Sequence, residues 1–232
     1  MKRDFSPDEP ELMDLPQPVT PELQRDLDNL EGLNRYFGGH AIFRYFLRRW
    51  CRPGQTYRVL DLATGAGDGP RTMAQWAARH GVTLEIHAVD LHPSTLEIAR
   101  RQSAAFPNIQ WHQGDALTYA TDLPYDLVTC TLALHHFSET DAVRLLHRCA
   151  ALSQGNVLVA DLERSWSTSL GVWLATALIY RDPMTKYDGR LSARRAFSYG
   201  ELRTLTEQAG WAGFHQRRFL PCRQAVWMER RV

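Results

Sequence analysis

Residues 58–69 have the residue types and the spacing of a loop that holds a polar, nucleotide-like ligand. They read Arg-Val-Leu-Asp-Leu-Ala-Thr-Gly-Ala-Gly-Asp-Gly, and a helix-like segment follows from about Pro70. Gly65 and Gly67 allow a tight turn with no Cβ in the way, and the N-terminus of the following helix offers free N–H groups. We therefore predict a strand–turn–helix unit in which Asp61 and bare backbone face a ligand.

Acidic residues also follow the next two predicted strands. Asp90 comes directly after a strand at 84–89, and Asp115 lies in Gly-Asp-Ala after a short strand at 109–112. The carboxylate of Asp90 can accept hydrogen bonds from both hydroxyls of a ribose. Asp115 and the N–H of Ala116 can meet the edge of an adenine ring. Although aspartates at strand ends are also common turn formers, this ordered set would converge at the carboxyl edge of one parallel sheet.

Three ligand classes compete for this loop. A nucleoside triphosphate would require a lysine after the glycines, and none is there. A dinucleotide would prefer a third glycine where Pro70 stands, although proline is tolerated at a helix start. Charge discriminates better, because Asp61 and Asp68 would repel a pyrophosphate. A ligand with an ammonium group and a sulfonium would be attracted to them, so we predict S-adenosylmethionine (SAM) rather than NAD.

The rest of the chain predicts an α/β fold around this loop. Helices are expected at 21–50, with a break at Gly38-Gly39, and then at 71–80, 94–106, 139–152 and 199–209. Ser94 and Glu97 are spaced as a capping box. Strands at 58–62, 84–89, 109–112, 126–131 and 156–160 alternate with the helices, which predicts a parallel sheet with helices on both faces. Strands at 213–219 and 224–229 are joined by a loop so short that they must be antiparallel.

Composition limits the classes of function. The chain has 232 residues and a formal net charge of +1, so no bulk basic field attracts nucleic acid or anionic lipid. Four cysteines lie far apart without a C-x-x-C pair, so neither a metal site nor a disulfide framework is expected, and a reducing cytoplasm fits best. The N-terminus lacks the apolar core of a signal peptide.

Two segments lie outside the alternating pattern. Residues 1–20 combine prolines and acids, which predicts a flexible arm before a single domain at 21–232. Residues 163–198 form an insertion with an apolar helix and a polar loop. Its apolar stretch at 166–180 is too short to span a bilayer. We expect a cap helix there, with contact to a lipid chain as the alternative.

These segments resemble the class I SAM-dependent methyltransferases. The resemblance rests on Val-Leu-Asp-Leu-Ala-Thr-Gly-Ala-Gly, His-Ala-Val-Asp, Gly-Asp-Ala and Tyr-Asp-Leu-Val-Thr-Cys, in that order along the chain. Ala63 replaces the first glycine of the family's usual loop, and Ala-Thr-Gly there is similar to the ubiquinone/menaquinone-biosynthesis methyltransferases. Segments 33–39, 132–138, 160–165 and 187–192 resemble small bacterial methyltransferases of aromatic polyketide pathways.

The resemblance implies a Rossmann-like sheet of seven strands with an antiparallel last strand, capped by the N-terminal helices and the insertion. It also implies SAM as cosubstrate. Asp61, Ala63, Gly65 and Gly67 would hold the methionine end, Asp90 and the adjoining Leu91 the ribose, and Asp115 and Ala116 the adenine. Thr131 and Leu132 would line the side of the sulfur.

His135 and His136 follow the fourth strand of this core. Their segment Leu-His-His-Phe-Ser-Glu-Thr-Asp resembles one in plant phenolic O-methyltransferases, where the residue matching His135 is the catalytic base and an acid stands at the position of His136. A phenol with a pKa of about 10 needs such a base at neutral pH. A histidine pair here can also simply shape the pocket, as in relatives that methylate carbon.

The acceptor pocket should be mostly apolar with a few polar groups. Its candidate residues are Tyr36, Phe37, Asp161, Arg164, Trp173 and Tyr187. The leading hypothesis is methyl transfer to the oxygen of a small apolar, phenolic or polyketide-type acceptor in secondary metabolism. The alternative is a C-methyltransferase acting on a quinone-type ring. A dinucleotide-binding oxidoreductase and a non-catalytic SAM-binding module come last. We expect a small-molecule partner, no nucleic acid and no stable membrane insertion, and the oligomeric state is open.

Overall fold

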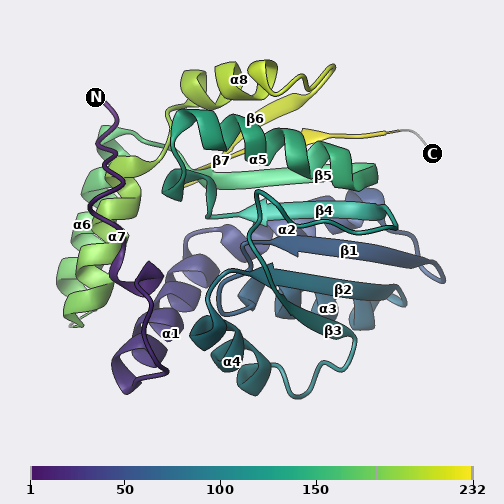
Figure 1. Cartoon of the computed structure of the whole chain (residues 1–232), viewed down its shortest axis with the longest axis horizontal. Coiled ribbons are helices and arrows are strands. Elements are labelled where there is room, and N and C mark those ends of the chain that lie inside the picture. Colours follow the sequence, from purple (N-terminus) through teal and green to yellow (C-terminus); the bar gives the residue numbers. More distant parts are fainter. Residues whose placement is uncertain (1, 181, 231–232) are drawn as a thin grey trace.

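A single seven-stranded sheet forms the centre of the protein. The computed structural model describes residues 2–180 and 182–230. The strands lie in the order β3-β2-β1-β4-β5-β7-β6 (Figure 1). Strands β1 to β5 are parallel, and β7 is antiparallel to both β5 and β6. The bounds are β1 Thr56–Leu62, β2 Thr83–Asp90, β3 Ile109–Gln113, β4 Tyr125–Thr131, β5 Ser153–Leu162, β6 His215–Phe219 and β7 Arg223–Met228.

The helices cover both faces of this sheet. The side chains of β1 alternate: Leu60 and Leu62 pack in the cluster that contains α5 and α8, and Val59 packs with α2 and α3. This arrangement confirms the predicted fold class. The helices are α1 Pro21–Tyr36, α2 Gly39–Trp50, α3 Asp68–His80, α4 Pro93–Gln102, α5 Glu139–Leu152, α6 Trp166–Leu178, α7 Pro183–Arg195 and α8 Tyr199–Gln208, with single 3₁₀ turns η1 at Leu12–Asp14 and η2 at Leu134–His136.

Two local predictions are wrong. The capping box at Ser94 does not form, because α4 begins at Pro93 with His92 as its N-cap, and Glu97 pairs with Arg101 instead. The polar part of the insertion is helix α7 and not a loop. It is capped by the carboxylate of Asp182, which accepts the backbone N–H groups of Met184 and Thr185. Its inner face packs on α6, which explains how so polar a sequence holds a helix.

The N-terminal arm runs beside α6 and α7 (Figure 1). The backbone N–H groups of Leu12 and Met13 donate to the Asp188 carboxylate of α7, at 2.7 and 3.0 Å. The Arg3 guanidinium donates to the carbonyl oxygen of Phe137 and lies 3.8 Å from the ring centre of Phe197. The arm is docked in this structure, and its flexibility stays a prediction. Among the described helices, none combines the length and the hydropathy needed to cross a membrane.

Asp26 is a buried acid at the contact between α1 and the rest of the cap. Neither of its carboxylate oxygens has a hydrogen-bond partner in the described part of the chain. Burial raises the pKa of Asp26 to about 6. The folded protein thus holds this proton more tightly than the unfolded chain, where the pKa of an aspartate is about 4. Its contribution to the free energy of unfolding therefore falls as the pH rises from about 4 through about 6.

We expect Asp26→Asn to stabilise the protein increasingly as the pH rises. Between pH 5 and pH 8, the difference in free energy of unfolding between variant and parent should grow by about 1 kcal/mol in favour of the variant. Urea unfolding at both pH values measures this, with Asp28→Asn on the exposed face of α1 as the control. A difference that is the same at both pH values would contradict the prediction.

Candidate functional site

One cavity of about 500 Å³ opens at the carboxyl ends of β1, β2 and β4, beneath the arm and the insertion. Its walls bring together most of the residues that the sequence singled out. Of the predicted cofactor and catalytic residues, those that line it are Asp61, Ala63, Gly65, Asp90, Leu91, Asp115, Ala116, Thr131, Leu132, His135 and His136.

The acids of the first loop are held in two different ways. Asp61 is buried and accepts hydrogen bonds from the hydroxyls of Thr64 and Thr129, at 2.6 and 2.5 Å. Burial outweighs these bonds and raises the pKa of Asp61 to about 7. Burial also opposes ionisation of Asp68, but hydrogen bonds from His40 and Asn34 outweigh it and keep the pKa of Asp68 below its usual value. The loop thus contains an ionised acid, Asp68, and a second acid, Asp61, whose ionisation a nearby cation would favour.

Asp90 ties the first loop to the second strand. Its carboxylate accepts the backbone N–H of Gly65 at 2.7 Å and that of His92 at 3.0 Å. Burial raises the pKa of Asp90, against the effect of these two bonds. Asp115 forms a turn by accepting the N–H of Leu117 at 2.8 Å. Both carboxylates therefore shape their loops while they border the cavity.

Two residues of the cavity wall hold a backbone conformation that side chains rarely adopt. Ala63 and Leu132 have φ of 53° and 55°, and no other non-glycine residue in the described segments has a positive φ. Such a conformation costs on the order of 1 kcal/mol or more, and it clusters at functional sites. These two residues follow β1 and β4, on either side of the crevice.

Gly65 and Gly67 of the loop have different surroundings. A Cβ added to Gly65 would meet no atom within 4 Å, so the ligand side of the turn is clear. A Cβ at Gly67 would lie 2.3 Å from Cη2 of Trp111. Gly67 is not among the residues that line the cavity and packs against Trp111, and its contact with the methionine end stays a prediction.

His135 is buried and paired with Asp161. Its Nδ1 lies 2.7 Å from Oδ1 of Asp161, and its backbone N–H donates to the other oxygen at 2.9 Å. Burial opposes the charged ring, but the carboxylates of Asp161 and Glu11 outweigh it and raise the pKa of His135 to about 10. Conversely, burial opposes ionisation of Asp161, but His135 outweighs it and lowers the pKa of Asp161. Asp161 therefore lies behind His135 and does not line the cavity.

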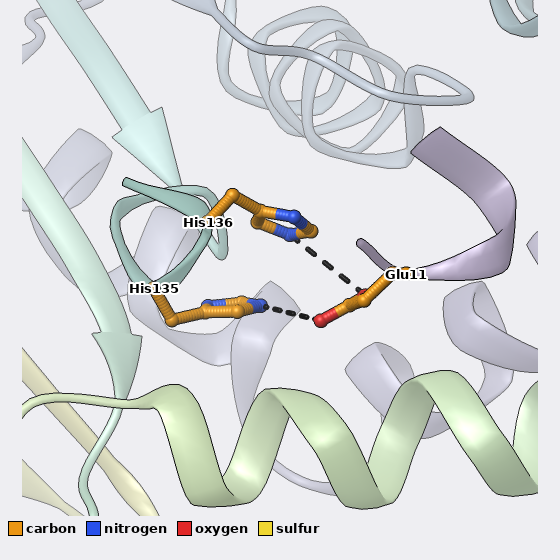
Figure 2. A group of neighbouring side chains, drawn as sticks. All are labelled: Glu11, His135 and His136. Atoms are coloured by element: carbon orange, nitrogen blue, oxygen red, sulfur yellow. Dashed lines mark ion pairs between the residues drawn. The ribbon is translucent and has the colours of Figure 1, made fainter. Parts of the chain in front are cut away.

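His136 has a similar arrangement with the arm. Its Nδ1 lies 2.6 Å from Oδ2 of Asp14. Burial opposes the charged form of the His136 ring, but the carboxylates of Glu11 and Asp14 outweigh it and raise the pKa of His136. Glu11 enters from the arm and faces the Nε2 atoms of both rings (Figure 2). Sequence reasoning missed Glu11 and Asp14, because nothing in a segment rich in acids and proline distinguishes these two residues from their neighbours.

The predicted acceptor residues divide into two groups. Phe37 lines the cavity, whereas Tyr36 is 80% exposed, and Trp173 and Tyr187 also face outward. Arg164 is buried elsewhere, with its guanidinium on the Ala196 carbonyl and on Glu201. The insertion presents the opposite face of α6 to the cavity, through Thr168, Val172 and Ala175. Asn34 and Arg223 also line the cavity; neither was among the predicted site residues, although Asn34 lies in segment 33–39.

Comparisons with known proteins agree with this architecture. The family described as "Methyltransferase domain" matches residues 59–155. The 2-phytyl-1,4-naphtoquinone methyltransferase of Thermosynechococcus vestitus is 36% identical over 35% of this chain and 35% of its own length. The ubiquinone/menaquinone biosynthesis C-methyltransferase of Cupriavidus metallidurans is 26% identical over 75% of this chain and 74% of its own. The match to the first of these relatives thus spans about a third of its length.

Solved structures show the same fold. Human N-acetylserotonin methyltransferase in complex with SAM superposes with a TM-score of 0.62 at 17% identity, over 89% of this chain and 55% of that one. The plantazolicin methyltransferase BpumL, in complex with a monoazolic desmethylPZN analogue and SAH, superposes with a TM-score of 0.67 at 10% identity, over 91% of both chains.

The family match covers residues 59–155, and the fold as a whole is similar to that of solved methyltransferases that bind SAM. The relatives matched over most of their length are quinone-biosynthesis methyltransferases.

We expect the chain to bind S-adenosylhomocysteine and not NAD(H). Asp90→Ala should weaken that binding at least tenfold, because it removes the predicted acceptor of the ribose hydroxyls and the hydrogen bond that holds the backbone N–H of Gly65. Isothermal titration calorimetry measures both ligands, with Glu85→Ala on the exposed side of β2 as the matched control. Binding of NAD(H) alone, or unchanged affinity in the Asp90 variant, would contradict the assignment.

Proposed function

We propose that this protein transfers a methyl group from SAM to a small apolar acceptor with a hydroxylated aromatic or quinone-type ring. The observation that carries the proposal is a single cavity shared by the predicted SAM residues, the two histidines and an apolar wall. The order of the acids along the strand ends supports the cofactor side of the proposal, and the names of the relatives support the acceptor side.

The residues of the loop edge fit SAM. Asp61, Asp68 and Asp90 border the cavity, and this set of acids suits a ligand that carries an ammonium and a sulfonium. Gly65 leaves the adjoining space free of side chain. When bound, SAM supplies a methyl group attached to positively charged sulfur. The residues proposed to hold it are Asp61, Ala63 and Gly65 for the methionine end, Asp90 and Leu91 for the ribose, Asp115 and Ala116 for the adenine, and Thr131 and Leu132 near the sulfur.

The acceptor side of the cavity is apolar and comes from the cap. Leu30, Leu33 and Phe37 come from α1 and its C-terminal end, and Val172 and Ala175 come from α6. Such a wall would exclude water and hold a flat ring over the strand ends. Alignment of the acceptor with the methyl group can supply several kcal/mol or more of the barrier.

Carbon is the receiving atom that the observations favour. Three relatives matched over 66–74% of their length are named C-methyltransferases. In addition, Nδ1 of His135 is held by Asp161 and its Nε2 lies 3.6 Å from Oε1 of Glu11, so a carboxylate faces each ring nitrogen. Oxygen is the second candidate, favoured by the similarity of the His135 segment to phenolic O-methyltransferases.

Product analysis separates the two candidates. Methyl-labelled SAM should label hydroquinones with apolar tails in preference to simple phenols, and the label should lie on a ring carbon. Mass spectrometry and NMR of the products locate the methyl group. A methoxy product would establish the oxygen alternative, and no labelled product from quinols, phenols or alkylresorcinols would contradict the proposed acceptor class.

We expect His135→Gln to keep affinity for S-adenosylhomocysteine and to slow turnover at least tenfold, roughly 1.4 kcal/mol of transition-state stabilisation. The physical reason is that His135, held in place by Asp161 from behind, forms part of the cavity wall that would face the acceptor. His147→Gln, an exposed substitution on α5, is the control. If turnover of the His135 variant matched that of the parent, His135 would have no part in the reaction.

A further inference from the structure

Three side chains from two distant parts of the chain converge at the wall of the cavity (Figure 2). Nε2 of His135 lies 3.6 Å from Oε1 of Glu11, and Nε2 of His136 lies 3.9 Å from Oε2. One donor atom from each of the three residues lies within 4.8 Å of the others. Neither nitrogen–oxygen distance is that of a hydrogen bond, since such bonds are about 2.7–3.2 Å long.

Both imidazole rings are oriented from behind by a carboxylate. Asp161 holds Nδ1 of His135 at 2.7 Å, and Asp14 holds Nδ1 of His136 at 2.6 Å. Ser192 donates its hydroxyl to Glu11 at 2.7 Å. A carboxylate on the far nitrogen is the usual support of a metal-binding histidine, because it fixes the ring and makes the near nitrogen a better ligand.

We propose that Glu11, His135 and His136 form a binding site for one divalent first-row transition metal ion. Ligands that bind such an ion at about 2.1 Å are themselves about 3–3.5 Å apart, and the two nitrogen–oxygen separations here are somewhat longer, at 3.6 and 3.9 Å. Two imidazoles and one carboxylate favour zinc, iron or a related ion over magnesium or calcium, which prefer oxygen ligands. Nothing in the sequence pointed to this site, because Glu11 reaches the histidines only through docking of the arm.

The site has a consequence for the acceptor, which rests on the proposed function. Three protein ligands leave further coordination positions for a small molecule, and all three residues line the cavity. The acceptor would supply a hydroxyl or carbonyl oxygen there, and this would fix its ring near Leu132, where the methyl group is expected. The competing explanation is a closed ion-pair cluster in which Glu11 only neutralises the two rings.

Metal binding to the untagged full chain tests the site. After removal of metal with a chelator, the protein is dialysed against Zn²⁺ or Co²⁺, and bound metal is counted by plasma mass spectrometry. The expected result is one ion per chain, with visible Co²⁺ absorption typical of mixed nitrogen and oxygen ligands. Glu11→Gln and His136→Gln should each weaken Zn²⁺ binding at least tenfold, and His147→Gln should leave it unchanged.

Two results would overturn the site: no bound metal in the parent chain, or equal binding in the parent and both ligand variants. Titration with S-adenosylhomocysteine confirms that each variant is folded. Asp14→Asn, which keeps all three ligands and only frees the His136 ring, gives a second, milder test, with an expected loss of affinity smaller than that of His136→Gln.

Methylation assays keep the two proposals apart. If the chain methylates a quinol only with Zn²⁺, Co²⁺ or Fe²⁺ restored, both proposals are supported. Equal methylation before and after metal removal overturns the role of the metal in holding the acceptor and leaves the proposed methyl transfer intact. Metal binding without methylation of any tested acceptor contradicts the proposed function and leaves the metal site standing.

Discussion

The order of the parallel strands is the constraint on which the rest of the structure depends. The chain goes outward from β1 to β2 and β3 and then returns to the other side of β1 with β4. The loops after β1 and β4 therefore lead away from each other, and a crevice opens between them. Ala63 and Leu132 lie on either side of this crevice with positive φ, so the backbone is held in an unfavourable conformation where a ligand is expected to bind.

Burial of acids connects this constraint to chemistry. Asp61 and Asp90 are removed from water and have raised pKa values, yet each is held by hydrogen bonds from the loops that it joins. A cationic ligand bound at this edge would favour the ionised form of these acids, which burial disfavours. Acids are also placed beside positive charge on the acceptor side of the cavity. There, Glu11 and Asp14 of the arm face the two histidines of η2. The two halves of the cavity are thus built by the sheet and by the cap, respectively.

Sequence reasoning reached the sheet side of this cavity and little of the cap side. The loop around Gly65 and the acids after β2 and β3 could be found because strand ends, turns and short spacings are local signals. On α6 the same reasoning chose the large Trp173, whereas helical periodicity turns Val172 inward and Trp173 outward. Glu11 could not be found at all, because its position depends on a long-range contact between the arm and Asp188. Asp161 was predicted in the right region, but it supports His135 from behind.

A crystal structure of the protein with S-adenosylhomocysteine and a quinol analogue tests the central claim most directly. The account predicts the ribose hydroxyls on Asp90, the sulfur beside Leu132, and the analogue's ring between the sulfur and the group formed by Glu11, His135 and His136. Electron density for the nucleoside outside this cavity, or an analogue ring separated from the sulfur by the arm, would contradict it.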